Sequence, residues 1–146
     1  MKLLDTSAVI DIDRGGVDTK VDQLDEQGRH AISMVTVTEL RLGGEIQYKN
    51  GTNQHQQACN DLDRLIARFN VLPITRPVAT TAAEIIATLR ESGEALDDLH
   101  DIYIGATART QQLPVLTGNV DHFDRIDRIQ VIDWEKLTVM KPSLQP

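Results

Sequence analysis

Short apolar runs alternate along the chain with longer segments in which apolar residues recur every three or four positions. The short runs predict buried strands at residues 2–6, 31–34, 71–74, 115–117 and 129–132. The longer segments predict helices at residues 17–24, 36–48, 58–69, 77–91 and 98–111. Strands that alternate with helices in this way predict an α/β fold, in which a central parallel sheet of about five short strands is covered by helices on both faces.

The length and composition favour a single domain with an aliphatic core. The chain has 146 residues, of which only 3% are aromatic, so leucine, isoleucine, valine and alanine must fill the interior. We expect one domain at residues 1–139 and a frayed tail at residues 140–146. No run approaches the roughly 18 apolar residues of a membrane span, and the N-terminus reaches Asp5 too early for a signal peptide. We therefore expect a cytoplasmic protein that does not contact a membrane.

Acidic residues outnumber basic ones. The chain has 22 Asp plus Glu against 15 Lys plus Arg, which gives a net charge of −7. This balance argues against a broad basic surface that grips nucleic acid through many phosphate contacts. It leaves open a local acidic site that binds metal ions, so the positions of the acids matter more than their number.

Five polar residues stand where a parallel sheet brings side chains to one edge. Asp5 follows the first predicted strand, and Asn119 and Asp121 follow the fourth. Glu39 and Asp101 are expected in the first turns of the helices that begin near residues 36 and 98. Ligands of such sheets bind outside the carboxyl ends of the strands, near a switch in strand order. We therefore expect these side chains to converge there.

Helix capping is the alternative interpretation of each acid. Asp5 could cap a following helix, while Thr36 and Glu39, and likewise Asp98 and Asp101, have the spacing of a capping box. Capping does not explain why all the acids converge on one edge, where carboxylates repel one another unless a cation compensates. Mg²⁺ and Mn²⁺ prefer oxygen ligands and can activate water against a phosphodiester. The acids together favour such a metal site.

Four motifs in order resemble those of a known family. They are Leu4-Asp5-Thr6-Ser7, Thr38-Glu39-Leu40, DIYIGATA at residues 101–108 and TGNVDHF at residues 117–123. From Met1 to about Ile132 the chain resembles a PIN domain, and more closely the VapC ribonuclease toxins of prokaryotic toxin–antitoxin pairs. The resemblance implies a three-layer α/β/α sandwich.

The resemblance also implies a function. It implies an Mg²⁺- or Mn²⁺-dependent endoribonuclease toxin that hydrolyses phosphodiesters in tRNA or rRNA, forms a homodimer and is neutralised by a cognate antitoxin. Asp5, Glu39 and Asp101 match the family's metal-binding acids, and with Asn119 they would form the catalytic set. Many members carry Asp where this chain has Asn119, so metal affinity there should fall, or Asp121 should partly substitute.

Several further residues could support this site. Asp97 lies four residues before Asp101 and would share its helical face if the helix extends back that far. The hydroxyls of Thr6, Ser7 and Thr117 lie close to the motif acids and could hold the carboxylates through hydrogen bonds. Their alternative roles are those of ordinary strand-end and capping residues.

The remaining chemically capable side chains are expected outside the site. We expect His30, His55 and His122 on the surface or in turns, and His100 need not face the same way as its neighbour in a helix. Cys59 and Trp134 are expected to serve packing. Candidate RNA contacts, unless they merely solvate the surface and pair with nearby acids, are Arg41, Lys49, Arg64, Arg68, Arg76 and Arg109.

Two other functions stay open. A PIN fold weakened at Asn119 could bind RNA or protein without cleaving, and a PIN nuclease could process RNA outside a toxin–antitoxin pair. Metal-dependent cleavage of RNA would separate the first of these from a nuclease. A dehalogenase-like phosphatase is less favoured, because it needs a second Asp where this chain has Ser7.

Overall fold

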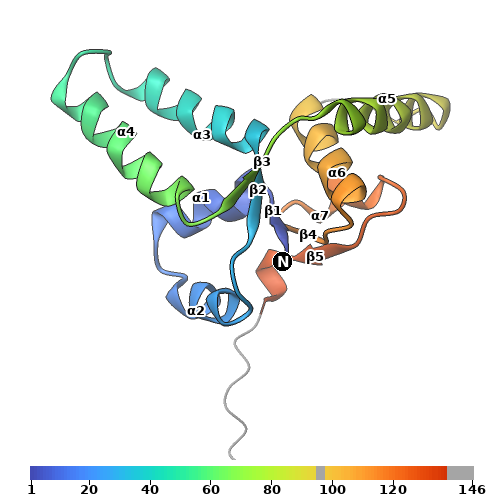
Figure 1. Ribbon diagram of the computed structural model, residues 1–146, viewed down its shortest axis with the longest axis horizontal. Coiled ribbons are helices and arrows are strands. Elements are labelled where there is room, and N and C mark those ends of the chain that lie inside the picture. The colour runs from blue at the N-terminus through green and yellow to red at the C-terminus, as the bar shows by residue number, and fades with distance from the viewer. Residues whose placement is uncertain (95–97, 138–146) are drawn as a thin grey trace, which may run out of the picture.

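Five parallel strands form one sheet in the order β3–β2–β1–β4–β5 (Figure 1). A computed structural model of the protein describes residues 1–94 and 98–137. The expected tail at 140–146 and Asp97 lie outside these residues. The strands are β1 (Leu3–Leu4), β2 (Ala31–Ser33), β3 (Asn70–Leu72), β4 (Val115–Thr117) and β5 (Val131–Asp133). The predicted parallel sheet of five short strands is therefore confirmed.

Helices cover both faces of the sheet (Figure 1). The helices on one side are α1 (Thr6–Arg14), α2 (Asp18–Glu26), α3 (Met34–Gln47) and α4 (Asn53–Ile66). The helices on the other side are α5 (Arg76–Glu91), α6 (Leu99–Gln111) and α7 (Val120–Asp124), and a 3₁₀ turn, η1 (Trp134–Lys136), follows β5. Within the described residues, no helix has the length and apolar character needed to span a membrane.

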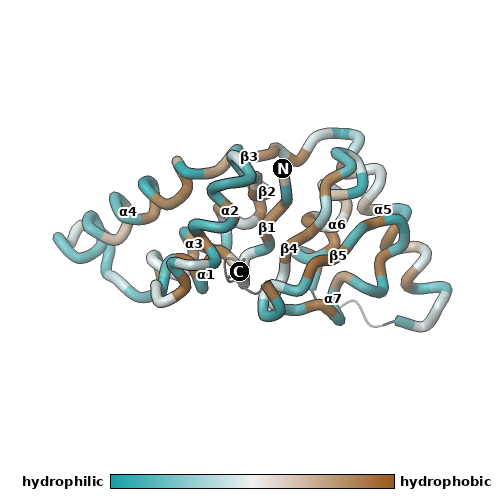
Figure 2. Tube along the Cα trace, turned by 90° about the horizontal axis from the view of Figure 1, so that it is seen from below, coloured by the Kyte–Doolittle hydropathy of each residue, from teal (hydrophilic) through white to brown (hydrophobic). Residues whose placement is uncertain are grey.

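The strands divide their side chains between two apolar cores. Leu3 and Leu4 are neighbours on β1 and both fully buried, but Leu3 packs with residues of α5 and α6, and Leu4 with residues of α1, α2 and α4. Val115 and Leu116 on β4 repeat this division, because successive side chains of a strand point to opposite faces. Figure 2 accordingly shows hydrophobic residues along the central strands.

Small residues let α6 pack closely against its neighbours, as predicted. Ala106 and Ala108 are almost completely buried. A Cβ atom at Gly105 would lie 2.7 Å from Cδ1 of Ile126, a distance that would force the isoleucine to move. Glycine at this position therefore allows the segment after α7 to lie directly on α6.

Two helices begin earlier than the periodicity predicts, because polar residues cap them. α3 begins at Met34, where the Ser33 hydroxyl accepts a hydrogen bond from the Val35 amide. α4 begins at Asn53, where the Thr52 hydroxyl accepts one from the His55 amide. The prediction that α3 starts at Thr36 is wrong, and Thr36 is instead buried inside the helix.

The strand order creates one switch point. From β1 the chain passes outward through β2 to β3, and then crosses to β4 on the other side of β1. The β1–β4 junction is closed by a hydrogen bond of 3.0 Å from the Asp5 amide to the Leu116 carbonyl. Ligands of open parallel sheets bind at such a junction, beyond the carboxyl ends of the strands. The predicted site acids should therefore lie at this junction.

A matched pair of isoleucines tests the core between the sheet and α5. Ile85 on α5 is 2% exposed, whereas Ile46 on α3 is 77% exposed. Ile85→Ala should lower the free energy of unfolding by about 2–5 kcal/mol, because it leaves a cavity. Ile46→Ala should change it by less than about 0.5 kcal/mol. Urea unfolding measures both, and equal losses would contradict the assigned core.

Candidate active site

Asp5 lies at the β1–β4 junction and is only 2% exposed. Its Oδ2 accepts a hydrogen bond from the Thr117 hydroxyl at 2.6 Å, and its Oδ1 accepts bonds from the Ser7 hydroxyl at 2.7 Å and the Ala8 amide at 3.1 Å. Asp5 thus caps α1, as the alternative interpretation allowed, but it is also tied to β4. Hydrogen bonds from both elements fix the carboxylate at the carboxyl edge of the sheet.

The same hydroxyls connect Asp5 to the loop after β4. The Thr117 hydroxyl accepts a hydrogen bond from the Asn119 amide at 2.8 Å, and the Ser7 hydroxyl accepts one from the Gly118 amide at 3.1 Å. A Cβ atom at Gly118 would lie 3.3 Å from Ser7 Oγ, so a side chain there would press on this hydroxyl. The network therefore couples the position of Asn119 to that of Asp5.

Glu39 projects from α3 toward α1 and α6. Its Oε1 accepts a hydrogen bond of 2.8 Å from the Thr6 hydroxyl, which is also 3.1 Å from the hydroxyl of Thr36. Its Oε2 lies 3.5 Å from Nδ1 of His100 on α6. Glu39 is the sixth residue of α3, so the expectation of a first-turn acid in a capping box with Thr36 is wrong.

Asp101 lies in the first turn of α6 and is 9% exposed. Its Oδ2 is 2.7 Å from Nδ1 of His122 on α7. The cap of α6 is Asp98, whose carboxylate accepts a hydrogen bond of 2.8 Å from the His100 amide. Because Asp98 fills the capping role, the carboxylate of Asp101 is left to face α7.

The three carboxylates influence one another electrostatically. Burial is the main cause that raises the pKa of Asp5, Glu39 and Asp101 above the usual values of these groups. The negative charge of Asp98 raises the pKa of both Asp101 and Glu39 further, and smaller contributions come from Asp5 at Asp101 and from Asp101 at Glu39. Carboxylate oxygens are the donors that suit a hard divalent cation. By donor type these residues fit Mg²⁺ or Mn²⁺, but their oxygen atoms do not all lie within 4.8 Å of one another, so the three side chains would have to move closer together to share one ion.

Asn119 and Asp121 lie beside this group, in an open hollow. Asn119 stands at the start of α7, where its side chain makes no capping hydrogen bond, and both residues are exposed. The residues that line the hollow are Gly118, Asn119, Val120, Asp121, His122, Asp133 and Glu135. The structure thus brings both candidates for the fourth position to one side of the site.

The sequence did not lead us to expect an aspartate, Asp133, and two histidines, His100 and His122, beside the candidate active site. Asp133 directly follows a predicted strand, so the strand-end argument applied to Asp5 would also have found it. His100 and His122 lie within 3.5 Å and 2.7 Å of carboxylate oxygens of Glu39 and Asp101. These contacts depend on how α3, α6 and α7 pack together, and no local spacing indicates them.

The other predicted positions agree with the structure only in part. His30 and His55 are buried, at 4% and 8% exposure, so their predicted surface positions are wrong, whereas His122 is exposed as expected. Trp134 is fully buried, and its indole donates to Asp11 at 3.0 Å, which confirms a packing role. Cys59 is also buried.

Four of the six candidate RNA-binding side chains have partners within the chain. Arg64 lies 3.5 Å from Asp61, and Arg68 lies 3.8 Å from Asp25. Arg41 pairs with Glu45, and Arg109 donates to the carbonyl of Asp127. These contacts favour the alternative in which the arginines pair with nearby acceptors on the surface.

Comparison with known proteins decides the family. The PIN domain model matches residues 2–129. Ribonuclease VapC1 of Rickettsia felis is 32% identical over 130 residues, which cover 89% of this chain and 93% of that protein. The chain is a PIN-domain protein of the VapC ribonuclease family. The resemblance found in the four motifs is therefore confirmed.

Other VapC proteins extend the similarity to a named enzyme and a solved structure. The tRNA(fMet)-specific endonuclease VapC of Shigella flexneri is 30% identical over 108 residues, which cover 74% of this chain and 77% of that protein. The structure of VapBC-5 from Mycobacterium tuberculosis, a member of the VapBC family of toxin–antitoxin systems, is 30% identical with a TM-score of 0.65, covering 90% of this chain and 97% of that one. The VapC fold thus extends across nearly the whole chain.

Replacing Thr117 tests the hydrogen bonds around Asp5. Thr117→Val keeps the shape of the side chain but removes the donor to Asp5 and the acceptor for the Asn119 amide. It should lower the free energy of unfolding by about 1–3 kcal/mol, because buried polar groups lose their partner. Thr110→Val is the control, since Thr110 donates to the Ala106 carbonyl of its own helix and contacts no acid of the site. A loss for Thr117→Val no larger than for Thr110→Val would contradict the network.

The raised pKa of Asp101 predicts a pH-dependent cost to stability. Because folding raises the pKa of Asp101, the native state binds more protons than the unfolded state between the two pKa values. The contribution of Asp101 to stability therefore falls as the pH rises from the ordinary value of 3.8 through the native pKa. In EDTA, Asp101→Asn should therefore gain stability relative to wild type over that pH window, as followed by thermal unfolding. Asp22→Asn, at an exposed position on α2, should show no comparable trend. A difference in unfolding temperature between Asp101→Asn and wild type that does not change with pH would contradict the predicted loss of stability.

Proposed function

We propose that this VapC-family protein is an Mg²⁺- or Mn²⁺-dependent endoribonuclease toxin that is held inactive by a cognate antitoxin. The observation that carries the proposal is the convergence of Asp5, Glu39 and Asp101. These acids come from three separate parts of the chain near the β1–β4 junction. Burial raises the pKa of all three, and neighbouring carboxylates raise the pKa of Glu39 and Asp101 further. The named activity of the relatives supports a nuclease over a binding module.

The metal would be held chiefly by Asp5 and Asp101, with Glu39 as a further ligand or as the residue that orients the attacking water. The amide oxygen of Asn119 and the carboxylate of Asp121 are the candidates to complete the set. When bound, Mg²⁺ or Mn²⁺ would neutralise charge on the phosphodiester and lower the pKa of a coordinated water.

The surrounding side chains keep these acids in position. Thr117 and Ser7 hold both oxygens of Asp5, and Thr6 holds one oxygen of Glu39. His122 binds one oxygen of Asp101 through Nδ1, which leaves the other oxygen available. Carboxylates held in this way lose little conformational freedom when substrate binds. Supporting contacts of this kind typically contribute about 10–100-fold to metal affinity or activity.

The proposed substrate is a structured cellular RNA in the cytoplasm, either tRNA or rRNA. The tRNA(fMet)-specific Shigella relative supports tRNA as the first to test. The net charge of −7 means that RNA must approach an acidic site, so we expect binding as well as cleavage to require the metal.

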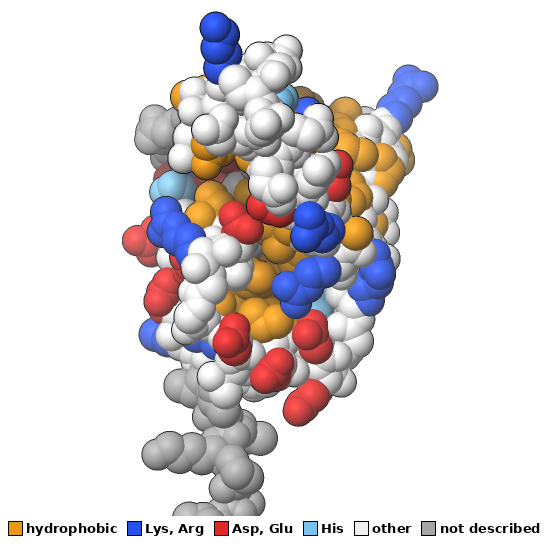
Figure 3. All heavy atoms as spheres, turned by 90° about the vertical axis from the view of Figure 1, so that its left-hand side faces the viewer, with side chains coloured by type: hydrophobic (Ala, Val, Ile, Leu, Met, Phe, Trp, Pro, Cys, Tyr) orange, Lys and Arg blue, Asp and Glu red, His pale blue; other side chains and the backbone are white. Residues whose placement is uncertain are grey.

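The proposed partners are an antitoxin and a second copy of this chain. The VapBC family of the M. tuberculosis neighbour supports the antitoxin. Figure 3 shows apolar side chains in a hollowed face, with acidic and basic side chains around them. Two apolar side chains of α3, Leu42 and Ile46, are exposed at 52% and 77%. We expect the antitoxin to cover apolar surface and to place a basic side chain among the carboxylates.

Cleavage of purified tRNA tests the proposed activity. The wild type should cleave in Mg²⁺ or Mn²⁺, stop in EDTA and recover when Mn²⁺ is added back. Asp101→Asn should cleave at least about 100-fold more slowly, because a lost ligand removes several kcal/mol of transition-state stabilisation. The exposed Asp22→Asn should cleave at the wild-type rate. RNA binding without cleavage in either metal would instead support a binding module, and wild-type cleavage by Asp101→Asn would overturn the assigned site.

A further inference from the structure

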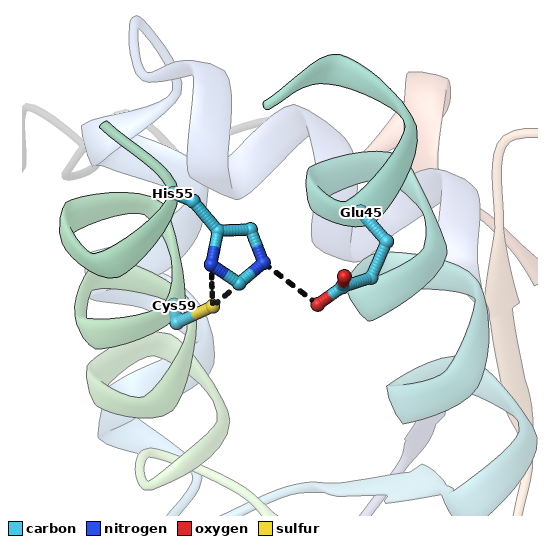
Figure 4. A group of neighbouring side chains, drawn as sticks. All are labelled: Glu45, His55 and Cys59. Carbon is cyan, nitrogen blue, oxygen red and sulfur yellow. Dashed lines mark hydrogen bonds and ion pairs between the residues drawn. The ribbon is translucent and has the colours of Figure 1, made fainter. Parts of the chain in front are cut away.

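A second group of metal-ligating side chains lies between α3 and α4, outside the candidate active site (Figure 4). Glu45 comes from α3, while His55 and Cys59 come from α4. The Nε2 atom of His55 lies 2.9 Å from Oε1 of Glu45 and 3.8 Å from Sγ of Cys59. One potential ligand atom from each of the three residues lies within 4.8 Å of the others, and no other set of three His, Cys, Asp or Glu side chains meets that limit among the described residues.

We propose that Glu45, His55 and Cys59 bind a borderline-soft divalent metal ion of the Zn²⁺ class. Zn²⁺ binds thiolate sulfur at about 2.3 Å and imidazole nitrogen or carboxylate oxygen at about 2.0–2.1 Å. A tetrahedral ion therefore separates a nitrogen from an oxygen ligand by roughly 3.3 Å, and from a sulfur ligand by roughly 3.5 Å. The separations found here are 2.9 Å and 3.8 Å, and the carboxylate oxygen and the sulfur lie within 4.8 Å of each other. Sγ of Cys59 is also 3.9 Å from Nδ1 of His55, so the thiol and the imidazole ring have to turn until Nε2 faces both partners.

The helical register favours the site. His55 and Cys59 are four residues apart, so they lie on the same face of α4, one turn from each other. The start of this turn is fixed, because the Thr52 hydroxyl accepts a hydrogen bond from the His55 amide. Glu45 is oriented by Arg41, whose Nε donates to it at 3.0 Å. Two of the three ligands are therefore positioned by helix geometry, and the third by an ion pair.

The ligands are buried enough to hold an ion and open enough to admit one. His55 and Cys59 are 8% and 9% exposed, whereas the side chain of Glu45 is 40% exposed. His55 and Cys59 also line an open hollow, together with residues of the α3–α4 turn, Arg41 of α3 and Asp63 of α4. An ion can enter from this hollow, and a water molecule can fill the fourth position. Binding requires the thiolate form of Cys59, so the thiol proton is released to solvent.

This site is separate from the acids at the β1–β4 junction. Glu45 lies six residues after Glu39 on α3, which corresponds to a rise of about 9 Å and a rotation to a different side of the helix. The donor sets also differ, because the acidic group offers oxygen atoms to hard ions while this group offers sulfur and nitrogen to softer ones. An ion here would join α3 to α4 and stabilise their hairpin, and it would take no part in phosphodiester chemistry.

Cobalt(II) is the probe that tests the proposal, because it replaces Zn²⁺ and reports its ligands by absorption. Metal-free protein, kept reduced without competing thiols, should bind Co²⁺ with a near-ultraviolet thiolate-to-cobalt band and visible bands of tetrahedral cobalt, and these bands should saturate at one equivalent of the thiolate-bound ion. Added Zn²⁺ should displace the cobalt and remove these bands. Zn²⁺ should also slow alkylation of Cys59 and raise the thermal unfolding temperature.

Three variants locate the bound ion. Cys59→Ser should lose the thiolate band, and Glu45→Gln, a change at a partly exposed side chain, should weaken Co²⁺ binding by at least about tenfold. Asp101→Asn should keep the thiolate band and the Co²⁺ affinity that this band reports, because the site of Asp101 contains no sulfur. Circular dichroism checks that each variant is folded. The absence of a thiolate band in the wild type, or its loss in Asp101→Asn, would overturn the proposal and leave the three residues as a hydrogen-bonded clamp.

Discussion

The buried carboxylate of Asp5 is the constraint on which the rest of the site depends. A charge at 2% exposure is costly unless several donors satisfy it. Here the donors come from α1 and from Thr117 at the end of β4. They can meet only because β1 and β4 are adjacent, and this adjacency is created by the crossover from β3. The same crossover contains α6, and α7 follows β4 directly, so the strand order that allows Asp5 to be buried also brings Asp101 and Asn119 close to the junction.

Most of the fold could be predicted from the sequence, because its signals are local. Each strand is a run of two or three residues, yet neighbours such as Leu3 and Leu4 enter different cores, and a sheet covered on both faces requires both to be apolar. The positions of Asp5 and Asp101 could be predicted for a similar reason, since strand ends and helix starts meet at one edge in this architecture. The helix starts at Met34 and Asn53 were predicted too late, because the prediction followed the apolar periodicity and did not use the caps Ser33 and Thr52.

Contacts between segments that are distant in sequence could not be predicted from local sequence patterns. His122 is 21 residues from Asp101 in sequence, and their contact requires α7 to lie against α6. His55 was expected near the surface, because no periodicity indicates that α3 returns alongside α4 to bury it. In both places a histidine that looks incidental in the sequence is paired with a carboxylate. The roles of these two histidines therefore depend on tertiary contacts that their sequence neighbours do not indicate.

The acidity of the chain has a different meaning once the acids are placed. A net charge of −7 at first argues against a nucleic-acid partner, because RNA and protein would repel each other. Carboxylates with raised pKa values lie near the β1–β4 junction, and they would repel a phosphate there. A divalent cation bound there would reverse the sign of the local interaction, since it attracts both the carboxylates and a phosphate. The acids that oppose RNA binding in the metal-free protein would then determine where the phosphodiester is held. The same carboxylates would therefore account for both the local negative charge and the position of cleavage.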